Sequence, residues 1–271
     1  MTESATQHSR KCLLSGVCTL ANTANCTPLC ASYIGMHGIS GVGGRMGSAN
    51  VPAEYRMLTL ATSPAREAQA IGPDNEGCAR LYRAYNVIER YVATFPRMFA
   101  EGGEGQRIKS LYLYSAEPGT GKTTTAAAIL AEFLIVHYVG SLRRGLTPAE
   151  RPAYFLDVNA WQTLYNGFNR SNVPQATAEP IAAEYYAVEE RAKTSAFAVL
   201  DDIGVRSATE AFRADLHGII NYRVANGLPT VYTSNVPMAE LSSVFDARLA
   251  DRIRDMTAEI EFSGQSRRGM R

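Results

Sequence analysis

The sequence predicts an α/β fold: a parallel sheet flanked by helices, preceded by a small Cys-rich N-terminal module. Three observations lead to this prediction. From residue 76 onward, short apolar stretches of strand character alternate with longer stretches that have apolar residues at helical spacing. A glycine-rich loop follows the first of these strands and opens a helix. Four of the five cysteines lie within residues 12–30. A chain of 271 residues suits one medium domain with a smaller appendage.

The composition changes along the chain and divides it into three parts. Residues 1–50 are rich in Cys, Gly, Ser, Thr and Asn and show no lasting period, so we expect a Cys-rich module there. Residues 51–75 contain Pro52 and Pro64 and are predicted to be a connector. Residues 76–271 should form the main domain.

The main domain is predicted to contain the following elements in order. Strands are expected at 108–116, 153–158, 197–203, 230–234 and 259–262. Helices are expected at 77–99, 122–139, 161–168, 181–193 and 210–224, with short helices around Leu241 and Leu249 and a polar loop with two prolines at 171–180.

Composition excludes some classes of protein. Apolar residues make up 46%, which is too many for a disordered chain. The net charge of +1 means that any nucleic-acid contact must use a local patch. There is no uninterrupted apolar run of about 18 residues, so no transmembrane helix is expected. The apolar run at residues 12–21 is too short and too broken for a secretion signal, so we expect a cytoplasmic protein with reduced cysteines.

The glycine-rich loop carries a nucleotide-binding motif, Ala116-Glu117-Pro118-Gly119-Thr120-Gly121-Lys122-Thr123, followed by Thr124. It matches G-x-x-x-x-G-K-[ST] except for Ala116 at the first glycine position. The glycines let backbone N–H groups converge on a triphosphate, and the helix N-terminus adds a positive dipole end. The predicted ATP-binding residues are therefore Pro118, Gly119, Thr120, Gly121, Lys122, Thr123 and Thr124. Lys122 supplies charge to the outer phosphates, and the Thr123 hydroxyl is a Mg²⁺ ligand.

Two further polar sites follow strands. Residues 198–200 are apolar and lead to Asp201 and Asp202. After a P-loop, the first acid holds Mg²⁺ and the second can polarise the attacking water, whereas the plainer alternative is an acidic pair that caps the next helix. Asn235 ends the strand at 230–234, which would place it between the two motifs and near the γ-phosphate. The alternative for Asn235 is a polar turn residue before Pro237.

Arginines near the C-terminus could complete the site. Arg248 and Arg252 share one helical face, so one of them could reach a neighbouring subunit's nucleotide. They could equally belong to a solvated helix face, paired with Asp246 and Asp251. Arg267 and Arg268 could touch the phosphates of their own subunit or form a basic tail.

The cysteine cluster comprises Cys12, Cys18, Cys26 and Cys30. Four thiolates suit tetrahedral Zn²⁺, and a polar segment gains stability from a metal. The spacings are irregular, so His8 or His37 could replace a ligand, and free thiols or disulfides are the alternatives. Aromatic residues with Arg170 gather between the two nucleotide motifs and could stack single-stranded bases, although core packing is the more common role for such residues: Tyr154, Phe155, Trp161, Tyr165 and Phe168.

Together these segments resemble bacterial and phage helicase loaders of the DnaC/DnaI type and the related IstB transposition ATPases of the AAA+ superfamily. The resemblance covers residues 51–271 and rests on segments VPAEYR, EPGTGKTT, AVLDDIG, TSN, ARLADRI and SGQSRR. It implies a P-loop AAA+ parallel sheet flanked by helices. By this likeness Asn235 is the first sensor, Arg252 the arginine finger and Arg268 the second sensor, and Arg248 is a possible substitute for the finger. Asp202 stands where many AAA+ proteins carry Glu.

The implied function is that of an ATPase with weak basal activity, whose cofactors are ATP, Mg²⁺ and Zn²⁺. It would bind the replicative hexameric DNA helicase and single-stranded DNA, and would self-associate through AAA+ interfaces. Two alternatives stay open: an IstB-like transposition helper that assembles on duplex DNA, and a nucleotide-regulated adaptor with negligible turnover.

Overall fold

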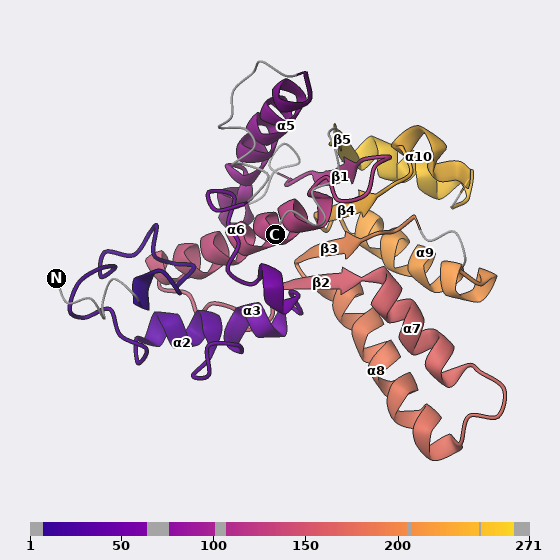
Figure 1. Ribbon diagram of the computed structural model, residues 1–271, viewed down its shortest axis with the longest axis horizontal. Coiled ribbons are helices and arrows are strands. Elements are labelled where there is room, and N and C mark those ends of the chain that lie inside the picture. The colour runs from indigo at the N-terminus through magenta and orange to yellow at the C-terminus, as the bar shows by residue number, and fades with distance from the viewer. Residues whose placement is uncertain (1–7, 64–75, 101–106, 205–207, 244, 263–271) are drawn as a thin grey trace.

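The computed structural model describes residues 8–63, 76–100, 107–204, 208–243 and 245–262 (Figure 1). Its centre is a five-stranded sheet in the order β2-β3-β4-β1-β5, in which all neighbouring strands are parallel. The strands are β1 (Ser110–Tyr114), β2 (Ala153–Asp157), β3 (Phe197–Asp201), β4 (Thr230–Ser234) and β5 (Thr257–Glu261). The predicted parallel sheet is thus confirmed.

Helices cover both faces of this sheet. In the main domain they are α5 (Glu76–Val92), η2 (Phe95–Phe99), α6 (Lys122–Arg143), α7 (Val158–Phe168), α8 (Gln175–Thr194), α9 (Glu210–Ala225), η4 (Met238–Ser243) and α10 (Ala247–Met256). Three short helices precede them: α2 (Ala31–His37), α3 (Gly44–Ser48) and η1 (Ala53–Tyr55). Figure 1 shows α7 and α8 side by side, extending away from the sheet.

The strands supply side chains to two apolar layers because neighbouring residues of a strand point to opposite faces. In β1, Leu111 and Leu113 belong to one buried cluster, and Tyr112 belongs to the other. β3 divides in the same way between Val199 and Leu200. A parallel sheet that is buried on both faces is what near-continuous apolar strands predict.

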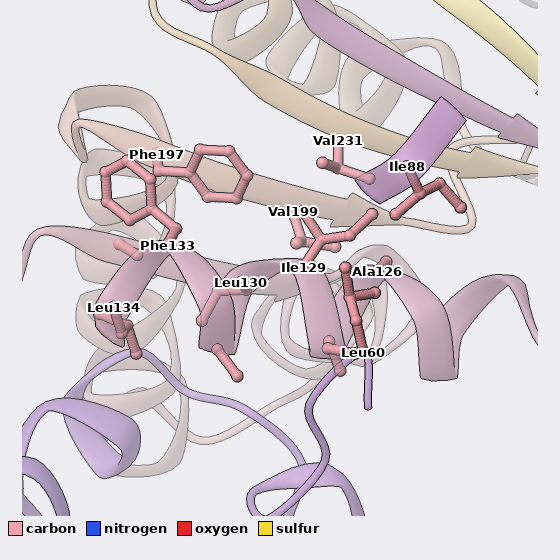
Figure 2. Close-up of a cluster of buried hydrophobic side chains, with 14 of the residues drawn as sticks. Leu60, Ile88, Ala126, Ile129, Leu130, Phe133, Leu134, Phe197, Val199 and Val231 are labelled. Carbon is pink, nitrogen blue, oxygen red and sulfur yellow. The ribbon is translucent and has the colours of Figure 1, made fainter. Parts of the chain in front are cut away.

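Helix α6 forms the centre of the first layer. Figure 2 shows Ile129, Leu130 and Phe133 of α6 next to Phe197, Val199 and Val231 of the sheet. Within the described residues, α6 is the one helix long and apolar enough to span a membrane, but 67% of its apolar window is buried. Its apolar character is that of a core helix packed between the sheet and the N-terminal segment.

The second layer is rich in aromatic side chains from α7, α8 and α9. The rings of Trp161 and Tyr185 stack with centroids 4.7 Å apart, and Phe212 packs against Trp161 at 4.8 Å. Tyr165 and Phe168 pack on the edge of this layer. The aromatic residues between the two nucleotide motifs are therefore packing residues, whereas Arg170 is exposed.

The N-terminal segment packs onto the main domain. Ala49 accepts a hydrogen bond through its carbonyl from the Phe155 N–H at 2.8 Å, beside the edge strand β2. The Arg45 guanidinium donates to the carbonyls of Pro148 and Ala149 at 2.7 and 2.8 Å. Apolar residues of the segment lie in the same buried cluster as α6: Leu13, Leu14, Met36, Met46, Val51 and Leu60. The domain boundaries at residues 50 and 75 stay a prediction.

Three local expectations differ from the structure. Helix α8 begins at Gln175 and includes Pro180, where a polar loop was expected over 171–180. Proline removes one backbone donor, and the exposed face of α8 accommodates its ring. The helix expected over 77–99 ends at Val92 and is followed by η2. Helices α2 and α3 were not predicted, because seven and five residues are too few to show a helical period.

Candidate nucleotide site

The P-loop connects the end of β1 to the start of α6. Gly119 and Gly121 have φ values of 75° and 97°, in the left-handed region that favours glycine. Gly121 is the N-cap of α6, so the first N–H groups of that helix face the loop. Ala116 is exposed and does not have a positive φ, which explains why the first glycine of the motif is not needed here.

The Lys122 side chain folds back onto the backbone of this loop. Its Nζ donates hydrogen bonds to the carbonyls of Ser115 at 3.2 Å and Glu117 at 3.4 Å. These partners are backbone atoms of the loop itself, so the ammonium group is held where phosphate oxygens would be bound. A triphosphate offers the lysine charged acceptors in place of neutral carbonyls, and such hydrogen bonds are about twice as strong.

The two predicted Mg²⁺ ligands, Thr123 and Asp201, are already in contact. The Thr123 hydroxyl donates to Asp201 Oδ2 at 3.2 Å. Asp201 ends β3 and is 8% exposed. The Thr233 hydroxyl, from the neighbouring strand β4, donates to Asp201 Oδ1 at 2.7 Å. Hydroxyl and carboxylate oxygens are the donor types that Mg²⁺ prefers, so this pair fits the ion.

Burial dominates the electrostatics of Asp201. Removal from water raises its pKa from 3.8 to about 6, while the hydrogen bonds from Thr233 and Thr123 act in the opposite direction. The negative charges of Asp157 and Asp202 add to the rise. A carboxylate in this environment gains from a nearby cation, because a positive charge offsets both the burial and the repulsion.

Asp202 has an unusual backbone conformation. Its φ is 61°, in a region that non-glycine residues rarely adopt. Two contacts hold it there: its N–H donates to Thr233 Oγ1 at 2.8 Å, and its Oδ2 accepts from Asn159 Nδ2 at 2.9 Å. Asn159 lies in the first turn of α7, where Asp157 caps the helix. The strained conformation turns the second carboxylate away from Asp201 and toward α7.

The sheet order brings Asn235 to the same edge. Strand β4 lies between β3 and β1, and the Ser115 N–H donates to the Ser234 carbonyl at 3.2 Å. Asn235 follows at once and is exposed. A Cβ at Gly204 would lie 2.7 Å from Asn235 Oδ1 and 2.9 Å from Ser234 Oγ, so a larger residue there would require these side chains to move. The strand order thus places Asn235 at the sheet edge that carries the P-loop and the acidic pair, and its role stays a prediction.

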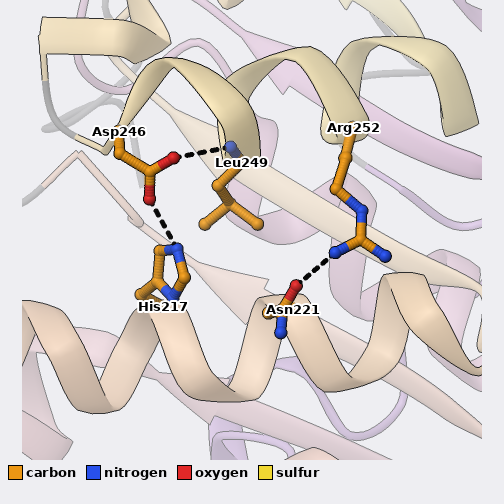
Figure 3. A network of polar contacts seen from close by, with 5 residues as sticks. All are labelled: His217, Asn221, Asp246, Leu249 and Arg252. Atoms are coloured by element: carbon orange, nitrogen blue, oxygen red, sulfur yellow. Dashed lines mark hydrogen bonds and ion pairs between the residues drawn. The ribbon is translucent and has the colours of Figure 1, made fainter.

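The predicted arginines have different positions. Arg252 is on α10 and is exposed, and its Nη1 donates to Asn221 Oδ1 of α9 at 2.6 Å (Figure 3). Arg248 is also exposed. Arg267 and Arg268 lie outside the described residues. The structure therefore brings together the P-loop, Asp201, Asp202 and Asn235, while the roles of the arginines stay predictions.

Sequence reasoning missed two residues of this site, Thr233 and Asn159. The Thr233 hydroxyl contacts both acidic residues, because it donates to Asp201 and accepts from the Asp202 N–H. The sequence did contain a signal for Thr233, since it is part of the strand end Thr233-Ser234-Asn235. No local pattern indicates Asn159, because its contact with Asp202 crosses 43 positions of the chain.

The four cysteines line one cavity of about 20 Å³, and His8 is part of its wall. All four thiols are free and half-buried. Burial, together with the neighbouring thiols, raises the pKa of Cys12. Within the described ranges, no group of three or more His, Cys, Asp or Glu side chains is arranged to hold a metal ion. Zinc needs its sulfur ligands about 2.3 Å from one point. The predicted zinc site at Cys12, Cys18, Cys26 and Cys30 is therefore not supported.

His37 is not a spare ligand either. Its Nε2 accepts a hydrogen bond from the Leu13 N–H at 3.1 Å, which joins α2 to the turn at residues 12–15. Burial and the nearby His8 lower the pKa of His37 to about 4. The imidazole is thus neutral at physiological pH, as an acceptor requires, and it acts as a structural link within the N-terminal segment.

Comparison with known proteins identifies the fold. No protein-family model and no curated protein sequence matches the chain. The crystal structure of the DnaC helicase loader is 22% identical, with a TM-score of 0.51, and the match covers 78% of this chain and 100% of that one. The DnaI crystal structure is 24% identical, with a TM-score of 0.48, and the match covers 82% and 99%.

A third solved structure is the replication initiator DnaA bound to AMPPCP and single-stranded DNA. It is 19% identical, with a TM-score of 0.46, and the match covers 80% of this chain and 53% of that one. Sequence identities this low show similarity of fold only, and we base the fold on the DnaC structure, whose TM-score is 0.51. The chain therefore shares its fold, a parallel sheet flanked by helices, with the DnaC helicase loader structure.

Proposed function

We propose that this protein is an ATP-dependent loader that binds the replicative hexameric DNA helicase and helps to place it on single-stranded DNA during replication initiation. The observation that supports this most is the nucleotide site at the carboxyl edge of the sheet. There Lys122 lies in the P-loop, and Thr123 and Asp201 are already in contact at 3.2 Å. The fold adds support, because it is that of a helicase loader.

Each residue of the site would have its own role in ATP hydrolysis. The P-loop residues Gly119 to Thr124 would bind the phosphates through backbone N–H groups, with Lys122 at the outer phosphates, and Pro118, which has no N–H, would shape the loop beside them. Thr123 and Asp201 would hold Mg²⁺, which neutralises charge that develops on the phosphates. Asp202 would polarise the attacking water, and Asn235 would contact the γ-phosphate. Arg252 of a neighbouring subunit would complete the site as the arginine finger, and Arg268 would act as the second sensor.

This arrangement implies slow turnover by the isolated chain. Asp202 has one methylene less than Glu, and the Asn159 amide holds its carboxylate at 2.9 Å. The neighbour's arginine is absent from a monomer, and an arginine finger is worth roughly 10³–10⁵ in rate. We therefore expect hydrolysis to rise when DNA or helicase brings subunits side by side. The work of such a loader would take place in the cytoplasm.

A loading assay tests the proposal directly. The replicative helicase of the same organism is mixed with circular single-stranded DNA that is coated with single-strand-binding protein and carries an annealed labelled strand. The parent protein with ATP should increase strand displacement, whereas Lys122→Ala, which lacks the phosphate-binding ammonium, should not. Helicase retained on an affinity column that carries the parent protein gives the binding step separately.

The same materials separate the alternatives. Fluorescence anisotropy compares binding to a labelled single strand and to a labelled duplex in the presence of ATP. Preference for duplex without effect on the helicase would favour the transposition helper. Loading that proceeds equally well with a non-hydrolysable ATP analogue, combined with negligible turnover, would favour the nucleotide-regulated adaptor.

A further inference from the structure

Two side-chain contacts join α9 to α10 (Figure 3). The His217 Nε2 lies 2.7 Å from Asp246 Oδ2, and the Arg252 Nη1 lies 2.6 Å from Asn221 Oδ1. Asp246 is also the N-cap of α10, because its Oδ1 accepts from the Leu249 N–H at 2.9 Å. His217 and Asn221 are four residues apart and so share one face of α9. The beginning and the middle of α10 are thus both attached to the same face.

Below these polar contacts the two helices are fixed by apolar packing. Leu249, Ala250 and Ile253 of α10 are buried at 1% or less exposure, in the layer that includes Leu216 and Ile220 of α9. The backbone of α10 therefore has little freedom relative to α9. The packing does not fix the exposed Arg252 side chain. Its direction is instead restricted by the hydrogen bond to Asn221.

The chemistry of this contact differs from an ion pair. The Asn221 amide oxygen is neutral, so it holds one N–H of the guanidinium and leaves the positive charge uncompensated. A guanidinium has five N–H donors, and those not used by Asn221 can still take a bidentate anion such as a phosphate. By contrast, Arg254 on the same helix lies 3.6 Å from the Asp251 carboxylate. The neutral partner keeps Arg252 both oriented and charged.

We infer that Asn221 is a positioning residue for Arg252: it orients the guanidinium on the surface of α10 so that it can reach the γ-phosphate of ATP bound by a neighbouring subunit. This inference rests on the proposed function, since it requires Arg252 to be the arginine finger. A long arginine side chain loses less freedom on reaching the phosphate when an amide already holds it. Loss of Asn221 should therefore slow hydrolysis and leave ATP binding unchanged.

The test uses the full chain and steady-state ATP hydrolysis stimulated by single-stranded DNA and helicase. Asn221→Ala should lower the stimulated kcat by roughly 10- to 100-fold, since misplacement of a catalytic group by about 1 Å costs up to about 10². The KM for ATP and the affinity of the dilute monomer should stay within about twofold of the parent. Asn226→Ala is the matched control, because Asn226 is the C-cap of the same helix and its side chain donates to the Tyr222 carbonyl at 2.8 Å.

Two further variants distinguish positioning from a merely structural role. Asn221→Asp keeps the acceptor but adds a charge, so the guanidinium should be held as an ion pair. Its stimulated kcat should be low and should recover, relative to the parent at the same ionic strength, as salt is raised from about 50 to 300 mM. In an Arg252→Ala background, Asn221→Ala should cause no further loss, because it acts only through Arg252.

The outcomes distinguish the role of Arg252 as arginine finger from the role of Asn221 as its positioning residue. Unchanged stimulated hydrolysis in Arg252→Ala would remove Arg252 as the finger, and the positioning role with it, and Arg248 would be tested next. Loss in Arg252→Ala combined with less than a twofold effect of Asn221→Ala would overturn the positioning role alone. An equal loss from Asn221→Ala in the parent and in the Arg252→Ala background would also overturn it, because the effect would then not pass through Arg252.

Discussion

The buried carboxylate of Asp201 should cost the free protein stability. Its pKa is raised from 3.8 to about 6, chiefly by burial. Between these two pH values the folded chain keeps a proton that the unfolded chain has lost, so the free energy of unfolding falls as pH rises through this window. Above about pH 7 the loss is complete. At about 1.4 kcal/mol per pH unit it amounts to roughly 3 kcal/mol.

Replacement of the carboxylate by an amide removes this cost. Asp201→Asn keeps an acceptor for the Thr233 hydroxyl and carries no charge at any pH. Without nucleotide or Mg²⁺, we expect the variant to be more stable than the parent by up to about 3 kcal/mol at pH 8, and equally stable near pH 4. The gain at pH 8 corresponds to a rise in Tm of roughly 6–12 °C.

The assay is urea or thermal unfolding followed by circular dichroism from pH 4 to pH 8. Asp202→Asn is the matched control, since it makes the same change one position away on a half-buried side chain whose φ of 61° asparagine tolerates. The gain in stability should be larger for the buried Asp201 than for this half-buried control. Saturating Mg²⁺ and ATP should reverse the order, because the parent alone gains stability from the bound ion. Parallel pH profiles for the parent and Asp201→Asn would refute the reasoning.

Three other predictions follow from the site and from the cysteine cavity. Lys122→Ala should abolish or greatly weaken ATP binding in a fluorescent-nucleotide titration, and parent-like affinity would contradict the P-loop assignment. Thr233→Val removes a hydrogen bond that lowers the pKa of Asp201, so the pH midpoint of Mg²⁺-dependent ATP binding should move upward from about 6, and an unmoved midpoint would exclude this role. In native protein, a thiol reagent should modify Cys12 more slowly than Cys26, because burial raises the Cys12 pKa.

Much of the fold could be predicted because its signals are local. Strands β1, β2 and β3 are short, largely apolar runs, whereas β5 alternates with acidic residues, and α6 starts after the P-loop glycine that the motif requires. The prediction was wrong at Pro180 because a local signal did not decide the structure there. Proline was treated as a boundary, but in α8 its exposed position allows the helix to continue past it. The order of the strands in the sheet was not available from local patterns, because it depends on packing between distant segments.

In the candidate site, too, residues with a local motif could be predicted and residues that act through distant contacts could not. The P-loop and the acidic pair have motifs within a few residues, so the sequence indicates them directly. The partners of the site residues are far away in the sequence: Thr233 contacts Asp201, Asn159 contacts Asp202 and Asn221 contacts Arg252, each across more than 30 positions. The N-terminal cysteines illustrate the reverse case: their composition favoured a metal site, whereas the described residues contain no such group and the segment packs on α6 through apolar side chains.

Nucleotide binding and folding should be linked in this protein, because the features proposed to hold Mg²⁺ and ATP are unfavourable in the free chain. Asp201 is a buried acid close to two other carboxylates, and Asp202 has a left-handed backbone conformation. Lys122 has the carbonyls of its own loop as acceptors. A bound Mg²⁺ would offset the burial of Asp201, and phosphate oxygens would give Lys122 charged partners. The same residues that lower the stability of the free chain therefore give the nucleotide-bound chain its largest gain, and nucleotide affinity can be followed as a rise in Tm.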